Sequence, residues 1–115
     1  MIADFVMAHP NIAGAQTYHN TGGMILRGPG VKSDQYEGAD VAVYDEIGKR
    51  GEAMLPYYNY VDVGHGLYDA HGGELDWFHA MQGIFCFSNE LFTAANYFRQ
   101  KNEGGFFGRD RKSVV

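Results

Sequence analysis

The sequence predicts an α/β fold whose sheet is covered by helices on both faces. The first observation is a continuous apolar run from Ile84 to Phe87, which lacks the polar alternation of a strand that faces water. The second is an amphipathic pattern over residues 40–55, typical of a helix that lies against a sheet. The third is a hydrophobic content of 45% in 115 residues, enough for the core of one domain. We therefore predict a single unit over residues 1–115.

The chain begins with a short helix, because Ile2, Phe5 and Val6 recur on one helical face and Pro10 stops the pattern. A domain that starts within a helix is unusual. We therefore expect the chain to be the downstream part of a larger protein, with a sheet that is incomplete at its N-terminal side and has an unpaired edge.

Residues 11–18 predict a short strand of small residues, and His19 follows at its end. Gly22 and Gly23, together with the RGPG run at residues 27–30, predict an irregular loop. Loops of this kind often display functional residues on a rigid scaffold. Arg27 is the cation nearest to His19 in the sequence, and we expect it to be a surface residue.

Residues 40–55 form the clearest helix, and Pro56 closes it. Gly48 and Gly51 each weaken a helix by about 1 kcal/mol relative to alanine, so we expect packing against a sheet to stabilise it. Its apolar positions share helical spacing and are Val41, Tyr44, Ile47, Met54 and Leu55.

The second half predicts a strand at residues 57–63, a glycine-rich loop, a short helix at residues 76–81 and a last strand at residues 83–87. We expect Trp77 and Phe78 to belong to the core. Glu90 would emerge just past the last strand, at the sheet edge where α/β proteins build their sites.

Composition narrows the function classes. The net charge of −5 disfavours nucleic acid as a partner, because phosphate binding needs a basic face. Cys86 is the single cysteine and lies in the apolar run, so we expect a buried, unreactive thiol. No apolar run approaches the ~18 residues of a membrane span, and residues 2–8 are too short for a signal peptide.

Three polar residues stand at positions that suit hydrolytic chemistry. His19 follows the first strand, Glu90 follows the last, and Tyr68 lies in the loop between them. Neutral imidazole binds Zn²⁺ well, and zinc lowers the pKa of bound water from 15.7 toward ~7, where a carboxylate can accept its proton. A histidine ligand, a separate carboxylate and a tyrosine on a loop are parts of metal-assisted amide hydrolysis.

Two blocks of the sequence resemble the zinc carboxypeptidases of the M14 metallopeptidase family. QTYHNTGGMILRGPG, residues 16–30, looks like the strand, third zinc-ligand histidine and following loop of that family. LYDAHGGELDWFHAMQGIFCFSNEL, residues 67–91, looks like its tyrosine loop, its glycine pair and Asp-Trp helix start, and its strand with the catalytic glutamate. The resemblance covers most of this chain but only the C-terminal part of the family's catalytic domain.

The resemblance implies a three-layer α/β fold with a mixed sheet, and peptide or protein C-termini as substrate. It makes His19 a Zn²⁺ ligand, Glu90 the general base and acid, and Tyr68 the residue that closes over substrate. Leu75 would face the pocket for the substrate's terminal side chain, where it suits an apolar residue. The family's other two zinc ligands form an HxxE motif on an upstream segment together with carboxylate-binding arginines, so we expect this chain alone to be inactive.

Two other interpretations stay open. One is a non-catalytic peptide-binding module or a degenerate remnant of the same family. The other is a free-standing metal site built from the HxxE spacing of His71 and Glu74 with His65 or His79, although Gly72 and Gly73 indicate a flexible turn. We otherwise expect solvated side chains for three histidines: His9 at a helix end, His65 in a loop and His79 on a helix surface.

Overall fold

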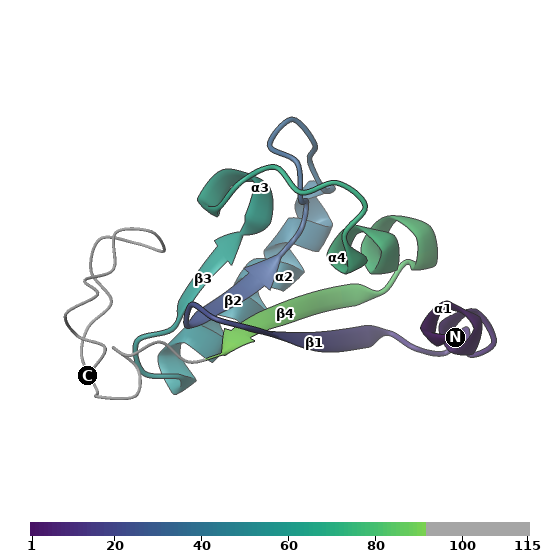
Figure 1. Ribbon diagram of the computed structural model, residues 1–115, viewed down its shortest axis with the longest axis horizontal. Helices are drawn as coiled ribbons and strands as arrows, with labels where there is room; N and C mark the ends of the chain where they lie inside the picture. The colour runs from purple at the N-terminus through teal and green to yellow at the C-terminus, as the bar shows by residue number, and fades with distance from the viewer. Residues whose placement is uncertain (92–115) are drawn as a thin grey trace.

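A computed structural model of the protein describes residues 1–91, in which four strands form one mixed sheet (Figure 1). The strand order is β1-β4-β2-β3, with β4 parallel to β1 and antiparallel to β2, and β2 parallel to β3. The α/β class and the mixed sheet are confirmed. The strands are β1 Gly14–Asn20, β2 Met24–Arg27, β3 Asn59–Asp62 and β4 Phe85–Leu91.

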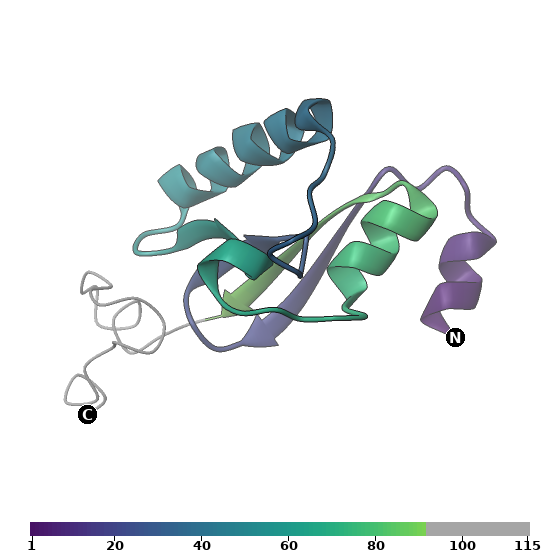
Figure 2. The same cartoon turned by 90° about the horizontal axis from the view of Figure 1, so that it is seen from above.

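Helices lie on both faces of the sheet. The long helix α2 covers one face, while α3 and α4 lie on the other (Figure 2). No helix within residues 1–91 is long and apolar enough to cross a membrane. The helices are α1 Ile2–Met7, α2 Gly38–Met54, α3 Val63–Gly66 and α4 Glu74–Asp76, and α4 continues as the π-helical segment η1 Trp77–Met81.

Helix α2 matches the predicted helix within two residues at each end. Tyr44 is fully buried and packs edge-on against the rings of Phe85 and Phe87 in β4, at centroid distances of 5.0 and 5.1 Å. Gly48 faces Tyr60 of β3 so closely that an added Cβ would collide with its ring. The glycine that weakens α2 as an isolated helix therefore allows it to approach the sheet closely.

The opposite face of the sheet carries the main hydrophobic core. Phe78 of η1 is buried there, and Trp77 packs against the same cluster, so the core prediction for both is confirmed. Cys86 is fully buried, as predicted, and burial raises the pKa of its thiol to about 12. The buried members are Val6, Met24, Leu26, Val63, Leu75, Phe78, Ile84 and Cys86.

The irregular loop predicted after Gly23 is wrong for residues 24–27, which form strand β2. Met24, Ile25 and Leu26 are all buried, and β2 pairs with β3 on one side and with β4 on the other. Pairing on both sides outweighs the neighbouring glycines, because tertiary contacts override local propensity in strands.

Strands β1 and β4 extend beyond their predicted ends. Strand β1 runs to Asn20, so His19 lies within it rather than after it. Strand β4 runs to Leu91, so Glu90 is also a strand residue and not a residue past the strand end. The polar stretch Ser88 to Glu90 continues the strand because β1 and β2 flank it on both sides.

The N-terminal helix is confirmed at residues 2–7, but most of its apolar side chains face solvent. Val6 is buried, whereas Ile2 is 73% and Phe5 60% exposed. Within residues 1–91, β1 is also an edge strand that pairs only with β4.

Candidate active site

The four residues assigned from the sequence line one cavity on the sheet face opposite α2. His19 comes from β1, Glu90 from β4, Tyr68 from the segment after α3, and Leu75 from α4. The cavity has a volume of about 320 Å³, and we call it the His19 cavity. Its other lining residues are Leu26, Gly30, Val63, Leu67, Ala70, Gly73, Glu74, Asp76 and Ser88.

His19 and Glu90 are brought together by the parallel pairing of β1 with β4, in which they are direct register partners. Side chains at paired positions point to the same face of a sheet, and neighbouring strands lie about 4.8 Å apart. Two residues 71 positions apart in the sequence therefore become neighbours through strand pairing alone.

Glu74 lies in this site through a contact with His19 that the sequence does not predict. His19 Nε2 lies 2.6 Å from Glu74 Oε1, and the hydroxyl of Thr17 donates to the same oxygen at 2.8 Å. The sequence placed Glu74 in a flexible turn, but it begins α4. Its acidic position in a first helical turn is the one local signal, because a carboxylate is favoured there.

The charges around His19 shift two pKa values. The hydrogen bond that His19 donates to Glu74 raises the pKa of His19, and the charges of Glu74 and Glu90 add to this effect, while burial opposes it. Burial raises the pKa of Glu90; the charge of Glu74 adds to that rise, and the charge of His19 opposes it. Glu90 is therefore a stronger base than an exposed glutamate.

Tyr68 lies at the rim of the cavity and Leu75 lies in its interior. The side chain of Tyr68 is 58% exposed, which places it at the rim, whereas Leu75 is 8% exposed and belongs to the core. A rim tyrosine can move over a bound group, and a buried leucine can form the wall against which an apolar stem packs.

Ser88 is a site residue that the sequence reading missed, because the predicted strand stopped at Phe87. Ser88 is 2% exposed, it lines the His19 cavity, and its Oγ has no hydrogen-bond partner in the described part of the chain. Its neighbour Asn89 points to the other face and accepts a hydrogen bond from Gln16. A buried hydroxyl without a partner is uncommon in folded proteins and needs an explanation.

Residues 1–91 contain no group of three or more His, Cys, Asp or Glu side chains placed to hold a metal ion. The two residues of the HxxE spacing, His71 and Glu74, line different cavities. Glu74 contacts His19, whereas His71 lines a cavity with Asp76 and His79. His65 pairs instead with Asp62, at 3.0 Å. The described residues thus do not assemble the free-standing metal site.

The prediction of a solvated His79 is wrong. Its side chain is 15% exposed, its ring stacks on that of Tyr36 at 3.7 Å, and its Nδ1 lies 3.0 Å from the Tyr44 hydroxyl. The aromatic residues of α2 and of the preceding loop cover this side of η1. His9 and His65 are exposed as predicted, although His65 lies in α3 rather than in a loop.

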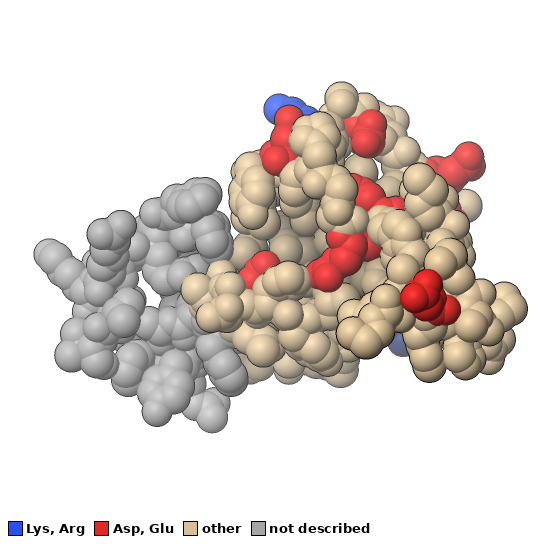
Figure 3. All heavy atoms as spheres, turned by 45° about the vertical axis from the view of Figure 1, so that its right-hand side comes forward, with Lys and Arg blue, Asp and Glu red and all other residues tan. Residues whose placement is uncertain are grey.

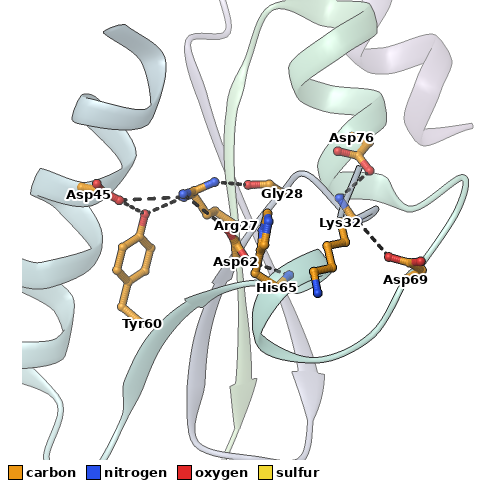
Figure 4. A network of polar contacts seen from close by, with 10 residues as sticks. Arg27, Gly28, Lys32, Asp45, Tyr60, Asp62, His65, Asp69 and Asp76 are labelled. Atoms are coloured by element: carbon orange, nitrogen blue, oxygen red, sulfur yellow. Dashed lines mark hydrogen bonds and ion pairs between the residues drawn. The ribbon is translucent and has the colours of Figure 1, made fainter. Parts of the chain in front are cut away.

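The prediction of a surface Arg27 is also wrong, because its side chain is only 12% exposed. Its guanidinium lies 3.9 Å from Asp45 and 3.6 Å from Asp62, and its Nε donates to the Tyr60 hydroxyl at 2.9 Å (Figure 4). The Tyr60 hydroxyl in turn donates to Asp45. We call these four residues the Arg27 cluster.

A larger cavity of about 640 Å³ lies on the α2 face, between α2 and β1. Its lining is mostly apolar and includes Ile25, Ile47, Phe85 and Phe87, with none of the four residues assigned from the sequence. The four residues assigned from the sequence thus line the smaller of these two cavities.

The sequence matches no protein-family model, and no curated protein matches it at a significant level.

Proposed function

We propose that this chain is the C-terminal portion of the catalytic domain of a zinc-dependent carboxypeptidase. The intact protein would remove C-terminal residues from peptides or proteins. The observation that supports this proposal is convergence: His19, Tyr68, Leu75 and Glu90, taken from two separate sequence blocks, line one cavity. The three-layer carboxypeptidase-like architecture belongs to the same proposal.

Glu90 would exchange protons in this reaction. Its carboxylate lies beside His19 on the neighbouring strand, and burial raises its pKa, so it binds a proton more readily than an exposed glutamate. The same group can release that proton to a leaving amine, because a carboxyl whose pKa lies closer to neutrality serves in both directions.

The described residues provide only part of a zinc site. His19 is the one ligand that the resemblance assigns, and its Nε2 is held by Glu74 at 2.6 Å. A catalytic zinc site uses about three protein ligands, and residues 1–91 contain no such group. The proposal therefore requires two further ligands from polypeptide outside these residues, and His19 must exchange Glu74 for the metal.

Two measurements test the proposal. The 115-residue chain, supplied with zinc, should not hydrolyse N-acylated peptides, and chelator-sensitive hydrolysis by this chain would contradict the missing-ligand argument. The coding sequence upstream of Met1 should contain an in-frame HxxE followed by arginines.

In the longer protein, Glu90→Gln should lower kcat by about 10²-fold or more, because it removes the proton acceptor. Glu46→Gln is a matched control, since Glu46 lies on the exposed side of α2 and pairs with Arg50. Equal activity of both variants would remove Glu90 from the mechanism.

A second candidate is a non-catalytic peptide-binding module of the same family. The observation that favours it is that His19 Nε2 is already held by Glu74 at 2.6 Å. A native start at Met1, peptide binding without zinc and no hydrolysis would together support this module over the enzyme.

A further inference from the structure

The unpaired hydroxyl of Ser88 indicates that the His19 cavity binds a polar ligand. Ser88 is 2% exposed and its Oγ has no hydrogen-bond partner among residues 1–91, yet the residue lines the cavity. Leaving a buried hydroxyl unpaired is costly, and a polar group bound in the cavity would remove that cost.

Two carboxylates lie near this hydroxyl on the same face of the sheet. Glu90 is two residues further along β4, which corresponds to about 6.6 Å in a strand. Glu74 lies over the adjacent β1, where its Oε1 contacts Thr17 and His19. Because Thr17 and His19 are the register partners of Ser88 and Glu90, the Glu74 carboxylate lies beside the Ser88 to Glu90 segment.

The charges of the residues that line the cavity favour a cationic ligand over an anionic one. Among residues 1–91, its acidic and basic lining side chains are His19, Glu74, Asp76 and Glu90, and none of the lining residues is lysine or arginine. The Asp76 carboxylate is already engaged, since Gly30 N–H donates to one oxygen and the Tyr36 hydroxyl to the other. Acidic side chains also gather on the face of the protein shown in Figure 3. An anionic group would be repelled here, whereas a cation would meet two carboxylates that have capacity to accept.

The walls between these polar groups are apolar. Leu26, Val63 and Leu75 are each less than 10% exposed and all line the cavity. A volume of about 320 Å³ falls at the lower end of the ~300–1,000 Å³ range of small-ligand pockets. The cavity therefore fits a ligand with a hydrocarbon stem and a hydrogen-bonding tip.

We infer that the His19 cavity recognises an alkylammonium group, such as the side chain of a lysine-like residue. Its methylenes would pack against the leucine and valine walls, and its ammonium would donate to Ser88 Oγ and to the carboxylate of Glu74, with the charge of Glu90 nearby. An ammonium has three donors and no acceptor, which matches this set of acceptors. The apolar specificity expected from Leu75 alone is thereby replaced by an apolar stem with a cationic tip. Naming the group as a substrate side chain rests on the proposed function, but the ammonium site itself does not.

An NMR titration of the 115-residue chain tests this inference. The probes are n-pentylammonium, n-pentanol and pentanoate, which share a stem and differ in the charge of the tip. We expect saturable shifts of the Glu74, Ser88 and Glu90 backbone amides with n-pentylammonium, affinity about tenfold weaker for n-pentanol, and no saturable response with pentanoate.

Ser88→Ala and Glu74→Gln should each weaken n-pentylammonium binding about tenfold, the typical effect of one hydrogen bond to a charged group. Glu46→Gln removes an exposed carboxylate on α2 and should leave binding unchanged. Equal binding of n-pentanol and n-pentylammonium, or wild-type affinity in both cavity variants, would overturn the inference. A longer protein that is inactive but still responds to n-pentylammonium would contradict the proposed hydrolase and leave the ammonium site standing. A longer protein that hydrolyses peptides but does not respond to n-pentylammonium would contradict the ammonium site and leave the hydrolase standing.

Discussion

The Arg27 cluster and the His19 cavity lie on opposite faces of one sheet and differ in how completely their polar atoms are paired. In the Arg27 cluster, the guanidinium faces two carboxylates, and the Tyr60 hydroxyl accepts from Arg27 while it donates to Asp45. In the His19 cavity, Ser88 Oγ has no partner within residues 1–91, and burial acts against the charge of Glu90.

This difference separates a structural polar cluster from a candidate functional one. A buried polar group contributes to stability when its partners are present and costs stability when they are absent. The Arg27 cluster therefore joins α2, β2 and β3, whereas the His19 cavity retains one hydroxyl, that of Ser88, without a partner in residues 1–91. Functional sites are commonly less stable than the scaffold that carries them.

The largest expected effect follows from Arg27→Met. Removing the guanidinium leaves Asp45 and Asp62 without their cation, and breaking a buried ion pair costs about 3 kcal/mol of unfolding free energy. Arg50→Met is the matched control, because Arg50 is 75% exposed and pairs with Glu46 on the surface of α2. It should cost about 0.5 kcal/mol or less. Urea unfolding of both variants measures the difference, and equal losses would show that the Arg27 cluster is not structural.

Ser88→Ala should change stability in the opposite direction. The substitution removes a buried hydroxyl that has no partner within residues 1–91, so the ligand-free protein should gain about 1 kcal/mol. Thr17→Val provides the contrast, because the Thr17 hydroxyl donates to Glu74 and its loss should slightly lower stability. A destabilised Ser88→Ala variant in urea unfolding would mean that the hydroxyl is already satisfied.

The sequence predicted those parts of the fold that local patterns encode. The sequence predicts helix α2 to within two residues because its apolar positions repeat with helical spacing and Pro56 follows its end. Strand β2 was missed, because it has only four residues between glycines and depends on pairing with β3 and β4. The predicted end of β4 is wrong for the same reason. The polar residues Ser88 to Glu90 belong to the strand because they pair with the neighbouring strands β1 and β2.

The candidate site likewise contains some residues that local sequence patterns predict and others that depend on the folded structure. Residue type and order placed His19 and Glu90 in the site, and strand register then makes them neighbours. The roles of Glu74 and Ser88 depend on distances that no spacing rule contains, since Glu74 contacts His19 across 55 positions. The sequence predicts a surface position for Arg27 because arginine usually lies there, whereas the residues that enclose it come from α2 and β3.

The smallest expected effect concerns Glu90→Gln and depends on pH. Burial raises the pKa of Glu90 above its ordinary value of 4.5, so the unfolded chain ionises first and wild-type stability falls as pH rises from 4.5 through the folded-state pKa. The variant cannot ionise. It should therefore match wild type near about pH 3.5 and be more stable at about pH 7, by only about a few tenths of a kcal/mol because the carboxylate keeps much of its water. At neutral pH, Glu74→Gln should instead be less stable than wild type, since Glu74 accepts hydrogen bonds from Thr17 and His19. Urea unfolding at both pH values measures each difference. A Glu90→Gln variant less stable than wild type at neutral pH would show that the carboxylate has a partner, and the contrast with the Arg27 cluster would then fail.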